Sequence, residues 1–310
     1  EDLPAEVVAS AQRHILDTFG VGVRGRLHEN AVNSLQGLLS INSSHGSVAI
    51  WGSSKKLSCE YAALSNGIAS HCLDFDDTHT DSIVHGSTVI LPVVIAIGES
   101  LRLSGKEVLT AFVAGWEVAA RIGLASKGTF HKRGFHTTSI AGIFGAVTAA
   151  SKLLNLSAEQ ITHAIGLAGS QAAGINEYLS NSSSSKSLHP GWSAFSAIMA
   201  SNLSKAGMTG PKSVFEGRDG IFKTYGIEMD CDLREATKDL SAKWEVTRIS
   251  IKPYPCCHFA HAFIDCIGNI VNQGIEVETI NSIKCFVPEL EQPLICEPFD
   301  LPERFSTEHQ

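Results

Sequence analysis

Apolar residues recur at helical spacing through most of the first 230 positions. In the first stretch, after Pro4, they fall on one side of a helix: Val7, Val8, Ala11, Ile15 and Phe19. The same spacing predicts further helices over 58–78, 91–103, 107–124, 138–154, 161–174 and 192–206. Ser157 and Gln160 have the form of a capping box before the fifth of these. Because the helices are apolar on nearly all sides, they are typical of a bundle interior, and the 27 glycines would let them approach closely.

The pattern changes near residue 240. Residues 244–252 alternate and are rich in β-branched side chains, which predicts a strand; 258–272 is a predicted helix and 282–287 a second strand. We therefore expect a mainly α protein with a large all-helical domain, 1–238, followed by a partial α+β lid domain, 239–310. Strands are expected only after about 240. The serine-rich stretch 180–185 is expected to form a mobile loop.

Composition and charge narrow the class of protein. The chain has 310 residues, of which 44% are hydrophobic and 18% charged, with a net charge of −8. That charge opposes nucleic-acid binding, and no apolar run of membrane-spanning length is found. No signal peptide is seen, although Glu1 in place of Met indicates that N-terminal sequence is missing. Eight cysteines without a C-x-x-C pair indicate reduced thiols. We expect a cytoplasmic protein, or a mitochondrial matrix protein if eukaryotic.

The first candidate site is an unusually polar segment, 71–79, followed by His85. If the predicted helix continues through it, His71, Asp74 and Thr78 share one face. Three acids and three histidines within an apolar domain are costly to bury without a function. The alternative is a solvated helix end.

Two further clusters each lead into a predicted helix. His136 stands at a helix N-terminus, where free N–H groups favour an anion and an imidazole can act as acid, base or carboxylate ligand; the alternative is a structural histidine. Lys186 follows the serine stretch and could pair with a substrate carboxylate, with His189 setting its position. The alternative there is an exposed lysine on a loop.

A fourth cluster begins at Lys252 and invites a metal interpretation through Cys256, Cys257, His258 and His261. Adjacent cysteines do not have the usual spacing of structural zinc ligands, and the spaced cysteines of an iron–sulfur site are absent. The sequence also lacks a Walker loop, a dinucleotide-binding glycine motif and a G-x-S-x-G motif, which weighs against nucleotide cofactors and esterase chemistry.

Taken in order, these segments resemble the MmgE/PrpD family. The resemblance rests on the motifs D-L-P at 2–4, I-L-D-T-F-G at 15–20, L-D-F-D-D-T-H at 73–79, H-G at 85–86, G-F-H-T-T at 134–138, A-A-S-K-L-L at 149–154, K-S-L-H-P-G at 186–191 and K-P-Y-P-C-C at 252–257. It implies a helical domain and a smaller lid domain, usually in homodimers, with a site between the domains that needs no metal or organic cofactor. By position, the residues that match that site are Asp74, Thr78, His85, His136 and Lys186.

The resemblance implies a cofactor-independent lyase acting on a small di- or tricarboxylate, most like 2-methylcitrate dehydratase. Cis-aconitate decarboxylase and iminodisuccinate epimerase are the alternatives within the family. The decarboxylase and epimerase branches of the family have a tyrosine near the position of 293–296, where this chain has Cys296. Family members are also longer than this chain. A truncated, non-catalytic homologue that only dimerises or binds a ligand is therefore an alternative of another class. A zinc- or iron-binding protein is the remaining alternative.

The expected roles follow from that chemistry. His136 or His85 moves the proton, Asp74 orients an imidazole, and Thr78, with His189, binds the substrate. Lys186 stabilises negative charge, and its predicted place on a loop leads us to expect that Lys186→Ala removes activity with little loss of stability. A nearby Asp74 would raise the pKa of an imidazole and burial would lower it, which leaves the pH dependence open.

Overall fold

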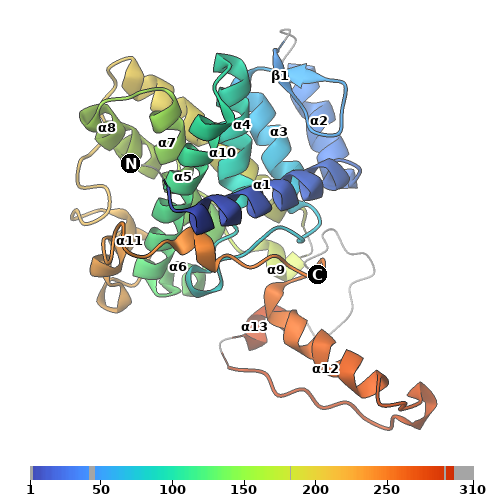
Figure 1. Ribbon diagram of the computed structural model, residues 1–310. Coiled ribbons are helices and arrows are strands. Elements are labelled where there is room, and N and C mark those ends of the chain that lie inside the picture. Colours follow the sequence, from blue (N-terminus) through green and yellow to red (C-terminus); the bar gives the residue numbers. More distant parts are fainter. Residues whose placement is uncertain (1–2, 42–45, 182, 290, 297–310) are drawn as a thin grey trace.

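The computed structural model describes residues 3–41, 46–181, 183–289 and 291–296, and across them the chain is mainly α-helical, as predicted (Figure 1). The α-helices, in chain order, are α1 Ala5–Gly25, α2 Glu29–Ile41, α3 Cys59–His71, α4 Ser87–Leu101, α5 Gly105–Ser126, α6 Thr129–Lys132, α7 Thr137–Leu153, α8 Ala158–Gly169, α9 Tyr178–Asn181, α10 Ser185–Lys205, α11 Ile221–Thr224, α12 His261–Val271 and α13 Gln292–Ile295. The capping box predicted from Ser157 and Gln160 is present at the start of α8.

Close helix crossings hold the body together. α5 packs on α7, and α10 packs on both α3 and α7. At the α5–α7 crossing, a Cβ on Gly145 would lie 2.4 Å from the carbonyl oxygen of Gly115, and at the α3–α10 crossing, a Cβ on Gly191 would lie 2.4 Å from that of Leu64. Neither crossing has room for a side chain, so glycine is required at both. The second crossing brings the end of α3 next to the first turns of α10.

One helix has the length and composition of a membrane span. α5 contains an 18-residue window of mean hydropathy 1.5, but 67% of that window is buried inside the protein. Buried core helices of globular proteins meet the same criterion, so the observation is weak evidence for a span. The sequence analysis had found no apolar run of that length because Glu117 and Arg121 interrupt this one.

The strand predictions are wrong. The strands of the described residues are β1 Val48–Ala49 and β2 Lys56–Leu57, an antiparallel pair that lies well before residue 240. Residues 244–252 form the short 3-10 helix Glu245–Arg248 and a single bridge at Ser250, and 282–287 has no strand. Alternation failed as a signal because no neighbouring strand is available in the described part of the chain to complete a ladder.

The C-terminal segment extends away from the helical body. α12 and α13 lie apart from the other helices in Figure 1, and most residues between 262 and 289 are exposed. The predicted helix over 258–272 is confirmed as the 3-10 turn His258–Ala260 followed by α12. The division into domains at 238 and 239 stays a prediction, and 297–310 of the predicted lid domain lie outside the described residues.

Candidate active site

The acidic segment after α3 turns sharply instead of continuing the helix. α3 ends at His71, and Asp74 has a left-handed φ of 46°. Aspartate is among the residues that adopt this conformation most readily, and such residues cluster at functional sites. The shared helix face predicted for His71, Asp74 and Thr78 is therefore wrong, although all three are buried in the same region. The turn directs the three acids inward, and none of their side chains is more than 2% exposed.

Two lysines share the carboxylate of Asp74. Lys186 Nζ lies 2.9 Å and Lys252 Nζ 2.7 Å from Asp74 Oδ1, and Lys252 also donates to the Asp74 carbonyl at 2.8 Å. All three side chains are at most 4% exposed. Burial lowers the pKa of Lys252, but the Asp74 and Asp76 charges outweigh it and raise that pKa. The Asp74 carboxylate thus holds two buried ammonium groups close together.

Lys252 was not among the residues assigned to the site from the sequence. Lys252 begins the K-P-Y-P-C-C motif, whose adjacent cysteines suggested a metal site instead. Its position depends on a backbone bridge in which Thr78 and Ser250 donate to each other's carbonyls, each at 2.9 Å. This bridge attaches the segment before Lys252 to the site turn and so directs the lysine inward.

Lys186 is not on an exposed loop. α9 ends at Asn181 and α10 begins at Ser185, so Lys186 lies in the first turn of a helix and is 3% exposed. Ser182, within the predicted serine loop, lies outside the described residues. The expectation that Lys186→Ala leaves stability almost unchanged loses its structural basis, because the side chain belongs to a buried ion pair.

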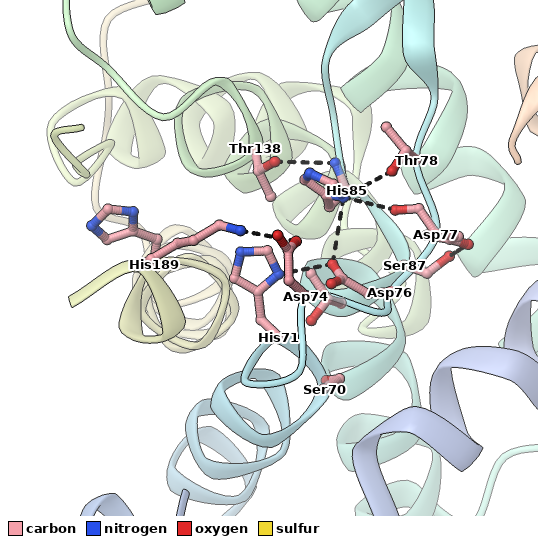
Figure 2. A network of polar contacts seen from close by, with 12 residues as sticks. Ser70, His71, Asp74, Asp76, Asp77, Thr78, His85, Ser87, Thr138 and His189 are labelled. Carbon is pink, nitrogen blue, oxygen red and sulfur yellow. Dashed lines mark hydrogen bonds and ion pairs between the residues drawn. The ribbon is translucent and has the colours of Figure 1, made fainter. Parts of the chain in front are cut away.

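His85 has one ring nitrogen committed and one left for chemistry. Its Nδ1 lies 3.0 Å from the Asp77 carbonyl, 3.1 Å from Thr78 Oγ1 and 3.6 Å from Asp76 Oδ2 (Figure 2). Since a carbonyl only accepts, Nδ1 carries the proton and Nε2 has the free electron pair. Burial lowers the pKa of His85 to about 3 despite the opposing charge of Asp76. His85 is therefore a neutral base at neutral pH.

His136 and His189 form a second imidazole pair. Their Nδ1 atoms are 3.0 Å apart, with His136 at the N-terminus of α7 as predicted and His189 on α10. Burial, then the neighbouring positive groups, lower the pKa of His136 well below its usual value and that of His189 to about 4. The buried ring of Tyr178 meets both histidines edge-on. Sequence reasoning missed this tyrosine, and nothing in its local pattern marks it.

A cavity opens directly beside these groups. It is lined by Asp74, Thr78, Thr80, Ile83, His85, Cys257, His258 and Phe259. Three of the five residues expected to line one pocket are on its wall. His136 and Lys186 join them through contacts, since Lys186 pairs with Asp74 and the rings of His85 and His136 are 6.4 Å apart. The five residues are thus gathered in one cluster, and their catalytic roles stay predictions.

The same cavity bears on the metal interpretation. Cys257 and His258 face it, and the rings of His258 and His261 stack with centroids 4.8 Å apart. Within the described ranges, no group of three or more histidine, cysteine, aspartate or glutamate side chains is arranged to hold a metal ion. The fourth cluster therefore gives a metal site no geometric support.

Comparisons with known proteins agree with the resemblance. The MmgE/PrpD N-terminal domain matches residues 1–233. The chain is 34% identical over 229 residues to cis-aconitate decarboxylase of Homo sapiens, covering 72% of this chain and 47% of that protein. It is 29% identical over 295 residues to cis-aconitate decarboxylase of Aspergillus terreus (91% and 59%), and 26% identical over 321 residues to a cis-aconitate decarboxylase-like protein of Aspergillus oryzae (97% and 66%). The chain thus spans about half to two thirds of the length of these relatives.

Proposed function

The chain belongs to the MmgE/PrpD family, and from that premise we propose that it is a cofactor-independent lyase acting on a small di- or tricarboxylate. The observation that carries the proposal is the pair of buried ammonium groups, Lys186 and Lys252, on the single carboxylate of Asp74. We expect a substrate carboxylate to bind beside these two ammonium groups, because charge-assisted hydrogen bonds to a carboxylate are among the strong ones. The same cations stabilise negative charge that develops on the substrate during reaction.

The imidazoles supply the proton transfer. In a dehydration, a neutral base such as His85 Nε2 removes a proton from the carbon beside a carboxylate, and the hydroxyl leaves as water with a proton from a second group. In a decarboxylation, the carbon–carbon bond to CO2 breaks, its electron pair spreads onto the neighbouring unsaturated carboxylate, and an imidazole that has taken up a proton delivers it to carbon. Both reactions develop negative charge beside a carboxylate, and fixed ammonium groups stabilise such charge.

Cis-aconitate decarboxylation is the first activity to test. The relatives at 26–34% identity are cis-aconitate decarboxylases or a protein like them, which favours this activity over the 2-methylcitrate dehydration expected from the motifs. The site chemistry itself fits either reaction, because both need fixed cations and a neutral imidazole. 2-Methylcitrate dehydration therefore remains the second candidate.

The test incubates the full-length protein in D2O with cis-aconitate, 2-methylcitrate, citrate and iminodisuccinate, each separately, and follows products by NMR. Decarboxylation yields CO2 and a product carrying one solvent deuteron, whereas dehydration yields a new olefin without loss of CO2. Lys252→Met should remove either activity, and Lys205→Met, an exposed change late in α10, should keep it. Binding of a carboxylate without any product would instead favour the non-catalytic homologue.

A further inference from the structure

A third imidazole lies between the two predicted base residues. His71 ends α3, and its side chain is 0% exposed. Its ring centroid is 5.5 Å from that of His85 and 5.5 Å from that of His136, and it stacks on His136 at 28°. The ring centroids of His85 and His136 are 6.4 Å from each other. The three imidazoles therefore form a compact triangle, with His71 touching both of the others.

Asp76 fixes this central ring. His71 Nδ1 is 2.8 Å from Asp76 Oδ2, and both side chains are fully buried. Burial alone would raise the pKa of Asp76, but the neighbouring His71 and His85 imidazoles and the hydrogen bond from His71 bring it to about 2. An ionised carboxylate only accepts, so Nδ1 donates. The same Oδ2 lies 3.6 Å from His85 Nδ1, so one carboxylate faces two imidazoles (Figure 2).

The other ring nitrogen sets His71 apart from an ordinary structural histidine. His71 Nε2 is buried and has no hydrogen-bond partner among the described residues. Buried polar atoms are usually satisfied. His79 provides the comparison: it is equally buried, and its two nitrogens contact Ser82 Oγ at 2.9 Å and Glu245 Oε2 at 3.1 Å. Packing alone therefore does not account for a histidine at position 71.

We propose that His71 is a positioning residue of this site: Asp76 fixes its ring, and the ring holds His85 and His136 in the orientation that proton transfer requires. The proposal rests on the proposed lyase function for its kinetic test. It assigns a role to a residue outside the substrate-contacting set, acting through two other side chains. The geometry resembles a catalytic triad only in that a carboxylate orients an imidazole.

The surroundings of His71 set the direction of its electrostatic effect. The charged and titratable groups around it come from several elements: Asp74 and Asp76 from the turn after α3, His85 before α4, His136 at the start of α7, Lys186 and His189 from α10, and Lys252 from the segment after Arg248. After burial, His71 is among the neighbouring groups that lower the pKa of His85, His136 and His189. Removing it should make those imidazoles easier to protonate.

The test uses His71→Asn in the full-length enzyme, since an asparagine amide can keep the hydrogen bond to Asp76 while the ring is lost. We expect kcat to fall about tenfold or more, as misplacing catalytic groups does, with KM for cis-aconitate or 2-methylcitrate changed less than about threefold. The acid limb of the pH–rate profile should move up by about one unit. The matched control, His79→Asn, breaks a buried histidine–carboxylate pair and should lower stability without moving that limb.

Histidine ring NMR titration gives a second readout that needs no turnover. The pKa values of His85 and His136 should rise in His71→Asn and stay in place in His79→Asn. If His71→Asn fails to fold, Asp76→Asn, which retains the shape of the side chain, should rotate the His71 ring and produce the same fall in kcat. Wild-type kcat with an unmoved pH limb, or unmoved ring titrations, would overturn the proposal. A wild-type enzyme that turns over none of the carboxylates would reject the lyase function, while the titrations would still decide the role of His71.

Discussion

His136 and His189 face each other through the same atom, Nδ1, at 3.0 Å. Depressed pKa values make both rings neutral at neutral pH, so one Nδ1 donates its proton and the other accepts it. The two rings are therefore opposite tautomers, one with a free electron pair on Nε2 and the other with a proton there. Such a pair offers a base and a hydrogen-bond donor side by side, which suits a reaction that both removes and returns a proton.

Loss of either predicted base should lower turnover strongly. His85→Gln and His136→Gln should each lower turnover by about 10² or more, the usual scale for a general acid or base. If both histidines act in one proton-transfer step, the double variant should lose less turnover than the product of the two single losses. Steady-state kinetics measure this. The control His163→Gln, on the remote helix α8, should retain turnover. If His85→Gln or His136→Gln keeps normal turnover, the histidine replaced in that variant is structural.

Asp74 should be the residue on which stability depends most within the site. Asp74→Asn leaves two buried ammonium groups without their shared carboxylate, so the free energy of unfolding should fall by about 3–5 kcal/mol, as when one partner of a buried ion pair is removed. Urea denaturation measures the loss. Asp81→Asn is the control, because Asp81 pairs with Arg248 at a half-exposed position and should matter by less than about 1 kcal/mol. Equal losses would contradict the importance of the buried ion pairs of Asp74 with Lys186 and Lys252.

Lys186 should be important for both activity and stability. Lys186→Met should abolish most turnover because one of two charge-stabilising cations is lost. The free energy of unfolding should fall by about 1–3 kcal/mol, since a charged hydrogen bond is removed, while Lys252 still neutralises Asp74. Lys205→Met at the exposed end of the same helix should change neither. Wild-type turnover in Lys186→Met would reject the proposed role.

Much of the helical body was predictable because its signal is local. Core helices such as α5 and α7 have enough apolar positions at intervals of three and four to be recognised from the sequence alone. The stretch 244–252 was misread because its burial has long-range causes. Val246 packs in the core, Glu245 pairs with His79, and Lys252 reaches Asp74, 178 positions earlier. Contacts at such separations leave no periodic trace in the sequence.

The site was predictable to the extent that it had motifs. Asp74, Thr78, His85, His136 and Lys186 were found because they match family motifs, and they do gather in one place. His71 was noticed but given no role, since its significance lies in ring stacking that only the fold creates. Burial also decides the direction of the imidazole shifts, because desolvation outweighs the Asp76 and Asp74 charges at His85 and lowers the pKa of His136 as well.

Acid should destabilise the protein at pH values above the range in which ordinary carboxylates titrate. Each depressed histidine takes up a proton more readily when unfolded, so its contribution to stability is lost as pH falls below about 6.5, at about 1.4 kcal/mol per pH unit. His85, His136 and His189 all act in this direction. Asp17, whose pKa burial raises to about 6, acts in the opposite direction and offsets part of the effect.

Urea denaturation at several pH values between about 7.5 and 5 measures this dependence. The free energy of unfolding should change little above about pH 6.5 and decline below it. His136→Gln removes one of the titrating groups, so its curve should be flatter than that of the wild type by up to about 1.4 kcal/mol per pH unit. A stability that is level across the range would show that these imidazoles are not held neutral in the folded protein.

Binding of a polycarboxylate should draw protons into the site. Burial keeps His85 neutral, with a pKa of about 3, but a bound trianion brings negative charges close to the imidazoles and raises their pKa values. Titration calorimetry with propane-1,2,3-tricarboxylate, a saturated and unreactive probe, at neutral pH in buffers of different ionisation enthalpy should reveal uptake of up to about one proton per site. The affinity should rise as the pH falls. His85→Gln should reduce the uptake, whereas His163→Gln should not. If the binding heat is the same in every buffer, the imidazoles stay neutral in the complex, and the proton needed to complete a decarboxylation must come from another group.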